Sequence, residues 1–147
     1  MAYIGKSISR VDVEDKATGK ALYPGDFNLP DQVYMKILFA NRPHAVVKEI
    51  DTTEAAALDG VLNVLTSEDV PVNEYGLIIP DQPVLCGPGS SKPFTDRVRF
   101  VGDQVVVVVA ETTKIAEQAR DLIKVTYEDL PLVDSIDEAI SENAPLL

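Results

Sequence analysis

The sequence has few of the residues from which small catalytic and metal sites are built. Among 147 residues there are one cysteine, one histidine and no tryptophan. The single cysteine, Cys86, cannot close an internal disulfide or form a cysteine cluster around a metal. The single histidine, His44, lacks the companion ligands of a zinc site. These absences argue against disulfide scaffolds, against zinc modules of Cys and His, and against a Ser-His-Asp triad.

Positive charge and long apolar runs are scarce as well. Thirteen Lys and Arg oppose 24 Asp and Glu, which gives a formal net charge of −11. Because nucleic acids and anionic membranes are bound mainly through clustered cations, we expect neither as a partner. The longest apolar run, Val105–Ala110, is far shorter than the ~20 residues of a membrane span. The N-terminus has no signal-peptide pattern, so we expect a cytoplasmic location.

What the sequence does have is the composition of one folded domain. Hydrophobic residues make up 46% and charged residues 25%, which is close to the average for globular proteins. A chain of this length buries roughly 70% of its surface on folding. We therefore predict a single domain over residues 1–147. Its residues 5–30 are expected to form an irregular arm, because Gly19, Pro24 and Gly25 interrupt any regular pattern.

Short strands dominate the rest of the pattern. They are expected at Val33–Ala40, Ala45–Ile50, Val61–Leu65, Arg97–Val101, Gln104–Ala110 and Lys124–Glu128. The five consecutive valines of Val105–Val109 are apolar on both faces, which predicts a central strand. Gly102 and Asp103 form a two-residue turn signal. This signal predicts that the strands before and after it pair as a hairpin.

Helical signals are fewer. Apolar residues from Ile115 to Ile123 recur with helical spacing and predict an amphipathic helix. Asp51–Glu54 has the form of a capping box that starts a short helix ended at Gly60. A tight helical turn is expected over Thr66–Pro71, and a short final helix over Ser135–Ser141. Because strands outnumber helices without regular βαβ alternation, we predict an α+β fold, with two or three short helices packed on a mixed sheet.

The residues by themselves form no convincing active site. The loop Gly87–Pro93 superficially resembles a phosphate-binding loop, but Lys92 is followed by proline and by no helix. We interpret this loop as a surface loop. Cys86 is interpreted as a buried or turn cysteine, and His44 as a residue that packs or hydrogen-bonds within a turn. An enzyme centred on Cys86 or His44 is a weaker alternative, which thiol labelling would test.

Five segments, taken in order, resemble one known family. They are Lys16–Tyr23, Pro43–Ala45, Ile50–Val61, Val98–Asp103 and Ala110–Pro131. The series resembles the aldehyde oxidase and xanthine dehydrogenase family, in the α/β hammerhead domain that begins the molybdenum-binding part of the large subunit. The resemblance runs from about Gly5 to the C-terminus. Two segments, Tyr127–Leu130 and Pro80–Pro83, favour xanthine dehydrogenase-like members.

The resemblance implies an α/β hammerhead fold and a structural role. The chain would be the N-terminal domain of a molybdopterin-dependent hydroxylase, packing on the molybdenum-cofactor domains and helping to shape the substrate channel. In the family, molybdopterin and molybdenum are held by later domains, which are absent from this sequence. Iron–sulfur clusters, and often FAD, lie on partner domains or subunits. The resemblance therefore implies that this chain alone binds no cofactor or metal and is not catalytic.

One family segment supplies candidate site residues. Tyr75–Ile78 resembles a stretch of Gly-Leu followed by an aromatic residue, which forms apolar wall in the substrate channel. The resemblance implies that Leu77 and Ile78 line the approach to molybdenum, although Ile78 replaces the aromatic residue. Packing of both side chains in the core of the domain is the alternative.

A second function stays open at the level of the sequence. The chain could be a free-standing hammerhead-type module that binds a small molecule or a protein, and a natural stop codon after Leu147 would identify it as such. For a domain of a larger subunit, the surface that faces the cofactor domains would be exposed in isolation. Because large exposed apolar patches associate, we expect the isolated domain to self-associate. The substrate and the electron acceptor are left open.

Overall fold

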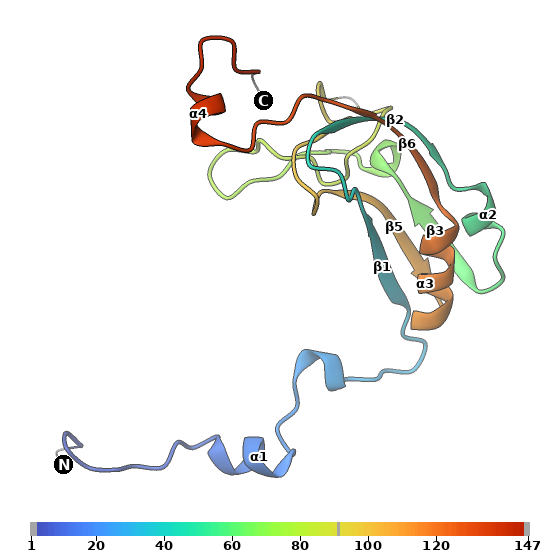
Figure 1. The fold of residues 1–147 in the computed structure, drawn as a ribbon. Helices are drawn as coiled ribbons and strands as arrows, with labels where there is room; N and C mark the ends of the chain where they lie inside the picture. The colour runs from blue at the N-terminus through green and yellow to red at the C-terminus, as the bar shows by residue number, and fades with distance from the viewer. Residues whose placement is uncertain (1–2, 91, 146–147) are drawn as a thin grey trace. The chain divides into compact units, whose positions relative to one another are not determined.

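The fold is described from a computed structural model that covers residues 3–90 and 92–145. The chain divides into two compact units, Met1–Gln32 and Val33–Leu147. We call them the arm and the body (Figure 1). The arm contains the short helix α1 (Val13–Thr18) and the 3-10 turn η1 (Pro24–Asp26).

Short-range ion pairs and turns define the local structure within the arm. None of its described residues is buried. Asp12 forms ion pairs with Lys16 at 2.6 Å and with Arg10 at 3.0 Å, and the bonds from Lys16 and then Arg10 lower the pKa of Asp12. Helix α1 ends at Gly19, whose φ of 73° is left-handed and therefore suits glycine. The arm thus has ordered turns but no core of its own.

The described strands of the body form two antiparallel sheets of three strands each (Figure 1). The first sheet has the order β1 (Tyr34–Phe39), β5 (Gln104–Ala110), β3 (Val61–Leu65), and the second has the order β4 (Arg97–Val98), β2 (Ala45–Asp51), β6 (Lys124–Asp129). The α+β class is confirmed. The single mixed sheet is replaced by two antiparallel sheets, because every described strand pair runs antiparallel.

Strand β5 lies at the centre of the first sheet, as its valines predict. Val105, Val106 and Val108 are all 0% exposed. One hydrophobic cluster joins these valines to Val47 of β2 and to Ala119 of helix α3 (Thr113–Leu122). Both sheets therefore share a single core with α3.

The predicted hairpin between Arg97–Val101 and Gln104–Ala110 is wrong. Strand β4 has only two residues and pairs with β2, not with β5. The carboxylate of Asp103 accepts hydrogen bonds from the backbone nitrogens of Arg99 at 2.6 Å and Phe100 at 3.2 Å. These bonds hold a turn that carries the chain from one sheet to the other.

Helix α3 (Thr113–Leu122) confirms the predicted amphipathic helix, and the Thr112 hydroxyl caps it by accepting from the Ile115 nitrogen at 3.2 Å. The short elements α2 (Thr53–Ala56), η2 (Ser67–Asp69) and α4 (Ile136–Ala139) also lie where they were expected. The capping box is wrong. Asp51 accepts from the Thr53 nitrogen at 3.0 Å, but Glu54 forms an ion pair with Lys124 of β6 instead of reaching back.

Candidate functional site

The candidate site is built on the proline-rich segment between η2 and β4, and buried Asn73 fixes its base. The Asn73 side chain is 1% exposed. Its Nδ2 donates to the Leu85 carbonyl oxygen at 2.8 Å, and its Oδ1 accepts from the nitrogens of Val84 at 2.9 Å and Leu85 at 3.0 Å. One side chain thus pins the start of the loop to its end.

Beyond Asn73, a short loop places apolar side chains in solvent. Tyr75 and Gln82 exchange backbone hydrogen bonds of 2.7 and 3.2 Å, and residues 76–81 form the loop between them. A Cβ atom at Gly76 would overlap the Ile79 carbonyl oxygen, so the tight turn requires glycine there. At the tip, Leu77 is 106% exposed and Ile78 93%. Neither side chain packs in the core of this chain.

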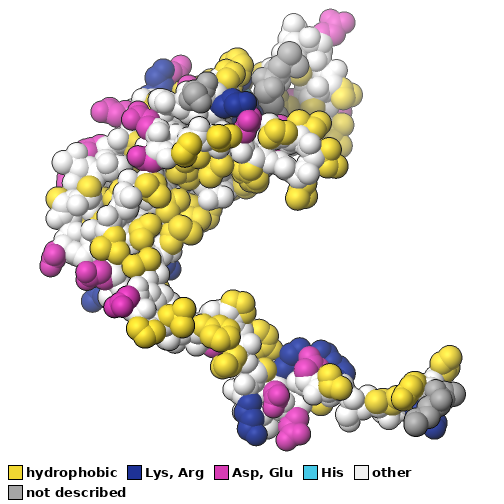
Figure 2. Space-filling view, turned by 180° about the vertical axis from the view of Figure 1, so that it is seen from behind, with side chains coloured by type: hydrophobic (Ala, Val, Ile, Leu, Met, Phe, Trp, Pro, Cys, Tyr) yellow, Lys and Arg dark blue, Asp and Glu magenta, His cyan; other side chains and the backbone are white. Residues whose placement is uncertain are grey.

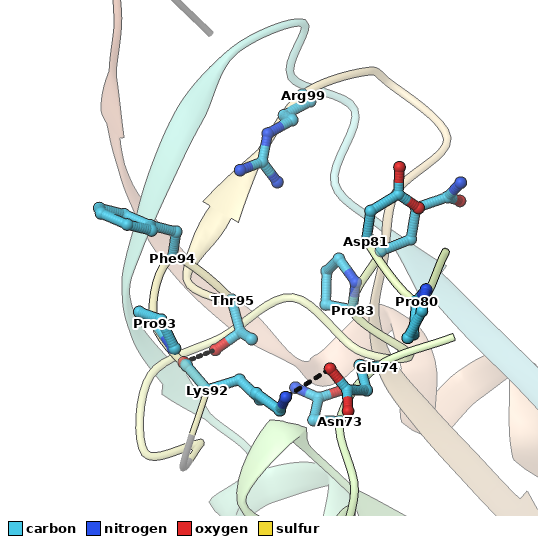
Figure 3. Close-up of a pocket in the computed structure, with 11 residues that line it drawn as sticks. Asn73, Glu74, Pro80, Asp81, Pro83, Lys92, Pro93, Phe94, Thr95 and Arg99 are labelled. Carbon is cyan, nitrogen blue, oxygen red and sulfur yellow. Dashed lines mark hydrogen bonds and ion pairs between the residues drawn. The ribbon is translucent and has the colours of Figure 1, made fainter. Parts of the chain in front are cut away.

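Two adjoining cavities lie beside this loop, with volumes of about 220 and 410 Å³. Both are lined by Asp81, Gln82, Pro83 and Arg99, and we call them together the Arg99 cleft. Figure 3 shows the smaller cavity, with Phe94 on one side and Pro83 on the other. At its lower end in this view, the Lys92 amine pairs with the Glu74 carboxylate at 2.6 Å.

Arg99 is the one cation of the cleft without a partner in the described residues. Its guanidinium points into the hollow (Figure 3) and makes no hydrogen bond or ion pair within residues 3–90 and 92–145. Lys92 is held by Glu74, and the guanidinium of Arg97 lies 5.4 Å from the centroid of the Phe94 ring. The lining of the cleft also carries the carboxylates of Glu74, Asp81 and Asp103, so it offers both charged donors and charged acceptors to a polar group. Arg99 was not singled out from the sequence; it was noted only as part of the family-like segment Val98–Asp103.

Exposed apolar side chains surround the site and extend over the body. Figure 2 shows hydrophobic groups over a broad part of one face. The large hydrophobic side chains exposed in the body are Val33, Met35, Phe39, Leu62, Val72, Tyr75, Leu77, Ile78, Ile79, Phe94, Phe100, Val101, Leu132, Ile136 and Ile140. Clustered apolar exposure of this kind is typical of a surface that another domain covers.

Cys86 has the environment of a structural cysteine. It is 1% exposed, and its thiol contacts the Arg97 carbonyl oxygen at 3.7 Å. Burial, and to a lesser extent the nearby charge of Asp103, raises the pKa of Cys86 to about 12. Because the thiolate is the nucleophile, this residue is not activated for nucleophilic chemistry at neutral pH.

We expect Cys86 to resist thiol reagents in the folded chain. At pH 8 the solution is about four units below its pKa of about 12, so the thiol stays protonated as well as inaccessible. Labelling with a chromogenic disulfide should be undetectable in native buffer and complete in 6 M guanidinium, where about one thiol per chain should react. Rapid labelling of the native chain would contradict this placement.

His44 ties the turn before β2 to the end of β6. Its ring nitrogen Nδ1 lies 2.8 Å from the Pro131 carbonyl oxygen, and because a carbonyl only accepts, Nδ1 is the donor. The His44 carbonyl oxygen accepts from the Leu130 nitrogen at 3.0 Å. The ring is 4% exposed, and its Nε2 has no partner among the described residues. These contacts agree with a role in fixing the turn.

Two hydrogen bonds hold the start of the loop Gly87–Pro93. The Ser67 hydroxyl donates to the Pro88 carbonyl oxygen at 2.6 Å, and the Gly87 nitrogen donates to the Thr95 carbonyl oxygen at 3.0 Å. No helix follows the loop, so it lacks the helix N-terminus of a phosphate site. In the part of the chain that is described, no three His, Cys, Asp or Glu residues are grouped to hold a metal ion. The same part contains no helix long and apolar enough to cross a membrane.

Comparison with known proteins gives consistent matches. The family model described as "Aldehyde oxidase and xanthine dehydrogenase, a/b hammerhead domain" matches residues 18–131. A probable xanthine dehydrogenase component of Bacillus subtilis is 42% identical over 139 residues, which are 94% of this chain and 18% of that protein. The nicotinate dehydrogenase large molybdopterin subunit of Eubacterium barkeri is 33% identical over 98% of this chain and 32% of its own length.

Solved structures agree with these relatives. The Cu,Mo-CO dehydrogenase superposes with a TM-score of 0.83 at 32% identity, over 97% of this chain and 18% of that chain. Quinoline 2-oxidoreductase from Pseudomonas putida 86 gives a TM-score of 0.79 at 33% identity, over 96% of this chain and 18% of that chain. The chain thus spans about a third or less of the length of these relatives.

Proposed function

Because the chain belongs to the a/b hammerhead domain family of aldehyde oxidase and xanthine dehydrogenase, we propose that it is the hammerhead domain of a molybdopterin-dependent hydroxylase large subunit. The observation that carries the proposal is the family match over residues 18–131, supported by the fold shared with Cu,Mo-CO dehydrogenase over 97% of the chain. In this role the domain packs on the cofactor domains of a cytoplasmic enzyme. Its exposed apolar side chains provide the surface for that packing.

The proposal assigns the cofactors to other domains. Molybdopterin with molybdenum supplies the hydroxylating centre, and iron–sulfur clusters, with FAD in many members, carry the electrons away. The described residues of this chain offer no metal-ligand group, so no step of the reaction is assigned to them.

Within this role, Leu77 and Ile78 form apolar wall along the approach to molybdenum. The tip they occupy is fully exposed here, while Asn73 and the Tyr75–Gln82 bridge fix its base. A loop with a fixed base and an apolar tip is suited to reach into a neighbouring domain, because little conformational freedom is lost when it docks.

Leu77→Asp in the intact enzyme tests this assignment. A charged side chain on the channel wall removes apolar contact with the substrate, which is worth about 1–3 kcal/mol. We expect KM for an aromatic heterocycle to rise roughly tenfold or more. Steady-state kinetics measures the change, with Asn63→Asp as the control because Asn63 is an exposed polar residue on β3 outside the apolar surface. Equal KM values for the two variants would show that Leu77 does not line the substrate channel.

The proposed function itself is tested by sequencing the native reading frame on both sides of this segment. We expect it to continue into domains with glycine-rich cofactor loops and a late glutamate, as the family resemblance implies. Purified native protein should then contain molybdenum, which metal analysis by mass spectrometry would detect. A reading frame confined to this segment would instead identify a free-standing binding module.

A further inference from the structure

We propose that Gly76 is a positioning residue of the substrate channel. Because it has no side chain, the chain can fold back over it, and this fold sets where the apolar tip of the loop points. The tip consists of three consecutive exposed side chains, Leu77, Ile78 and Ile79. The inference rests on the proposed function and adds to it the residue that fixes the channel wall, with Ile79 as a third wall residue.

The first argument is the close approach of the backbone to Gly76. A Cβ atom there would overlap the carbonyl oxygen of Ile79, and it would lie 2.7 Å from the carbonyl carbon of Ile79 and 3.1 Å from the Cα atom of Pro80. Ordinary van der Waals contacts of a Cβ atom lie at 3.4–4 Å. All three atoms belong to the backbone, so none can rotate away as a flexible side chain does. Any side chain at position 76 would therefore force the turn to open.

The second argument is that little else fixes the tip. Backbone hydrogen bonds between Tyr75 and Gln82 join its two ends, and the buried amide of Asn73 holds the base below them. Between these ends, residues 76–81 share no hydrogen bond or ion pair with the rest of the described chain. The packing at Gly76, together with the fixed φ of the proline at position 80, thus defines the course of the turn.

The third argument concerns what the tip can recognise. Leu77 is 106% exposed, Ile78 93% and Ile79 69%, and all three side chains are aliphatic. None carries a hydrogen-bond donor or acceptor, so this wall discriminates substrates by shape and apolar area. Such contact is the same in the bound substrate and in the transition state, so its loss raises KM and leaves kcat unchanged. A substrate long enough to reach the wall depends on Gly76, whereas a smaller one does not.

Gly76→Ala in the intact enzyme tests the inference, with Gly25→Ala as the matched control. A Cβ atom at Gly25 meets no atom within 4 Å, and neither glycine has a left-handed φ, so the two substitutions differ in the space around the new methyl group. We expect Gly76→Ala to raise KM roughly tenfold for a two-ring aromatic substrate and by less than about twofold for its one-ring analogue. The kcat values should stay unchanged, whereas partial unfolding would lower kcat for both substrates alike.

Methyl NMR of the chain itself supplies a second readout that needs no turnover. In Gly76→Ala the methyl signals of the three tip residues should shift, because the turn opens beneath them. The amide of Gln82 should exchange with solvent at its wild-type rate, because the hydrogen bonds of Asn73 at the base remain. The control Gly25→Ala should leave the tip signals in place.

Four outcomes would overturn the inference. They are unshifted tip signals, an equal change in KM for both substrates, an equal change in KM for both glycine variants, and a fall in kcat with KM unchanged. If Leu77→Asp also left KM unaltered, the channel role within the proposed function would fail as well. If only Gly76→Ala did so, the channel role would stand and this inference alone would fail, so the two failures are distinguishable.

Discussion

Val106→Asp is expected to leave the chain largely unfolded at neutral pH. Val106 is 0% exposed and lies at the centre of β5, opposite Leu38 of β1. A buried carboxylate without a partner costs several kcal/mol, and about 1.5–3 kcal/mol of valine burial is lost with it. A domain of this size has a total stability of only about 5–15 kcal/mol. Far-UV circular dichroism and urea titration would measure the loss of folded protein.

Val101→Asp is the matched control for this substitution. Val101 precedes the same strand but is 55% exposed, so the new charge stays in water. Its effect on the free energy of unfolding should remain within about 0.5 kcal/mol. If Val106→Asp unfolded at the same urea concentration as this control, β5 could not be the central strand of a packed sheet.

The position of β5 shows which part of the fold the sequence predicts well. Five consecutive valines are apolar on both faces, and this property requires cover on both sides wherever the strand lies. The helix at Thr113–Leu122 is equally well marked, because its apolar stripe and its Thr112 cap are both local. Patterns within one segment therefore predicted the elements themselves.

Pairing between segments was harder to predict. Gly102 and Asp103 signal a turn, and a turn is present, but the dipeptide does not specify which strands it joins. The Asp103 carboxylate binds the nitrogens of Arg99 and Phe100, which leaves β4 free to pair with β2. Glu54 shows the same limit, since its partner Lys124 is 70 residues away in the sequence. Long-range partners compete with local motifs, and no local pattern reveals them.

In the candidate site, too, some residues were found from the sequence and others only from the fold. Leu77 and Ile78 were found through a family-like segment, and the fold places both at an exposed tip. The sequence does not reveal which cation is left without a partner. In the fold, Glu74 pairs with Lys92 and the Phe94 ring contacts the guanidinium of Arg97, while Arg99 has no partner within the described residues. Asn73 had no sequence signal either, since its partners are backbone groups that any residues could supply.

Asn73→Ala is expected to loosen the whole proline-rich loop. The substitution leaves the nitrogens of Val84 and Leu85 and the carbonyl oxygen of Leu85 without their partner. Each buried group left unsatisfied costs about 1–3 kcal/mol, so for these three groups we expect a loss of at least about 3 kcal/mol in the free energy of unfolding. The backbone amides of Tyr75 and Gln82 should exchange with solvent on the order of a hundredfold faster, because the loop opens more readily. Urea titration and hydrogen exchange would measure the two effects.

Asn63→Ala separates this role from the general cost of removing an asparagine. Asn63 is exposed on β3, so its loss should change the free energy of unfolding by no more than about 0.5 kcal/mol. In the intact enzyme, Asn73→Ala should also raise KM in the same direction as Leu77→Asp, because a loosened base no longer holds the apolar tip in place. Slow exchange at Tyr75 and Gln82 in the Asn73→Ala variant would show that the prolines, not the buried amide, fix the loop.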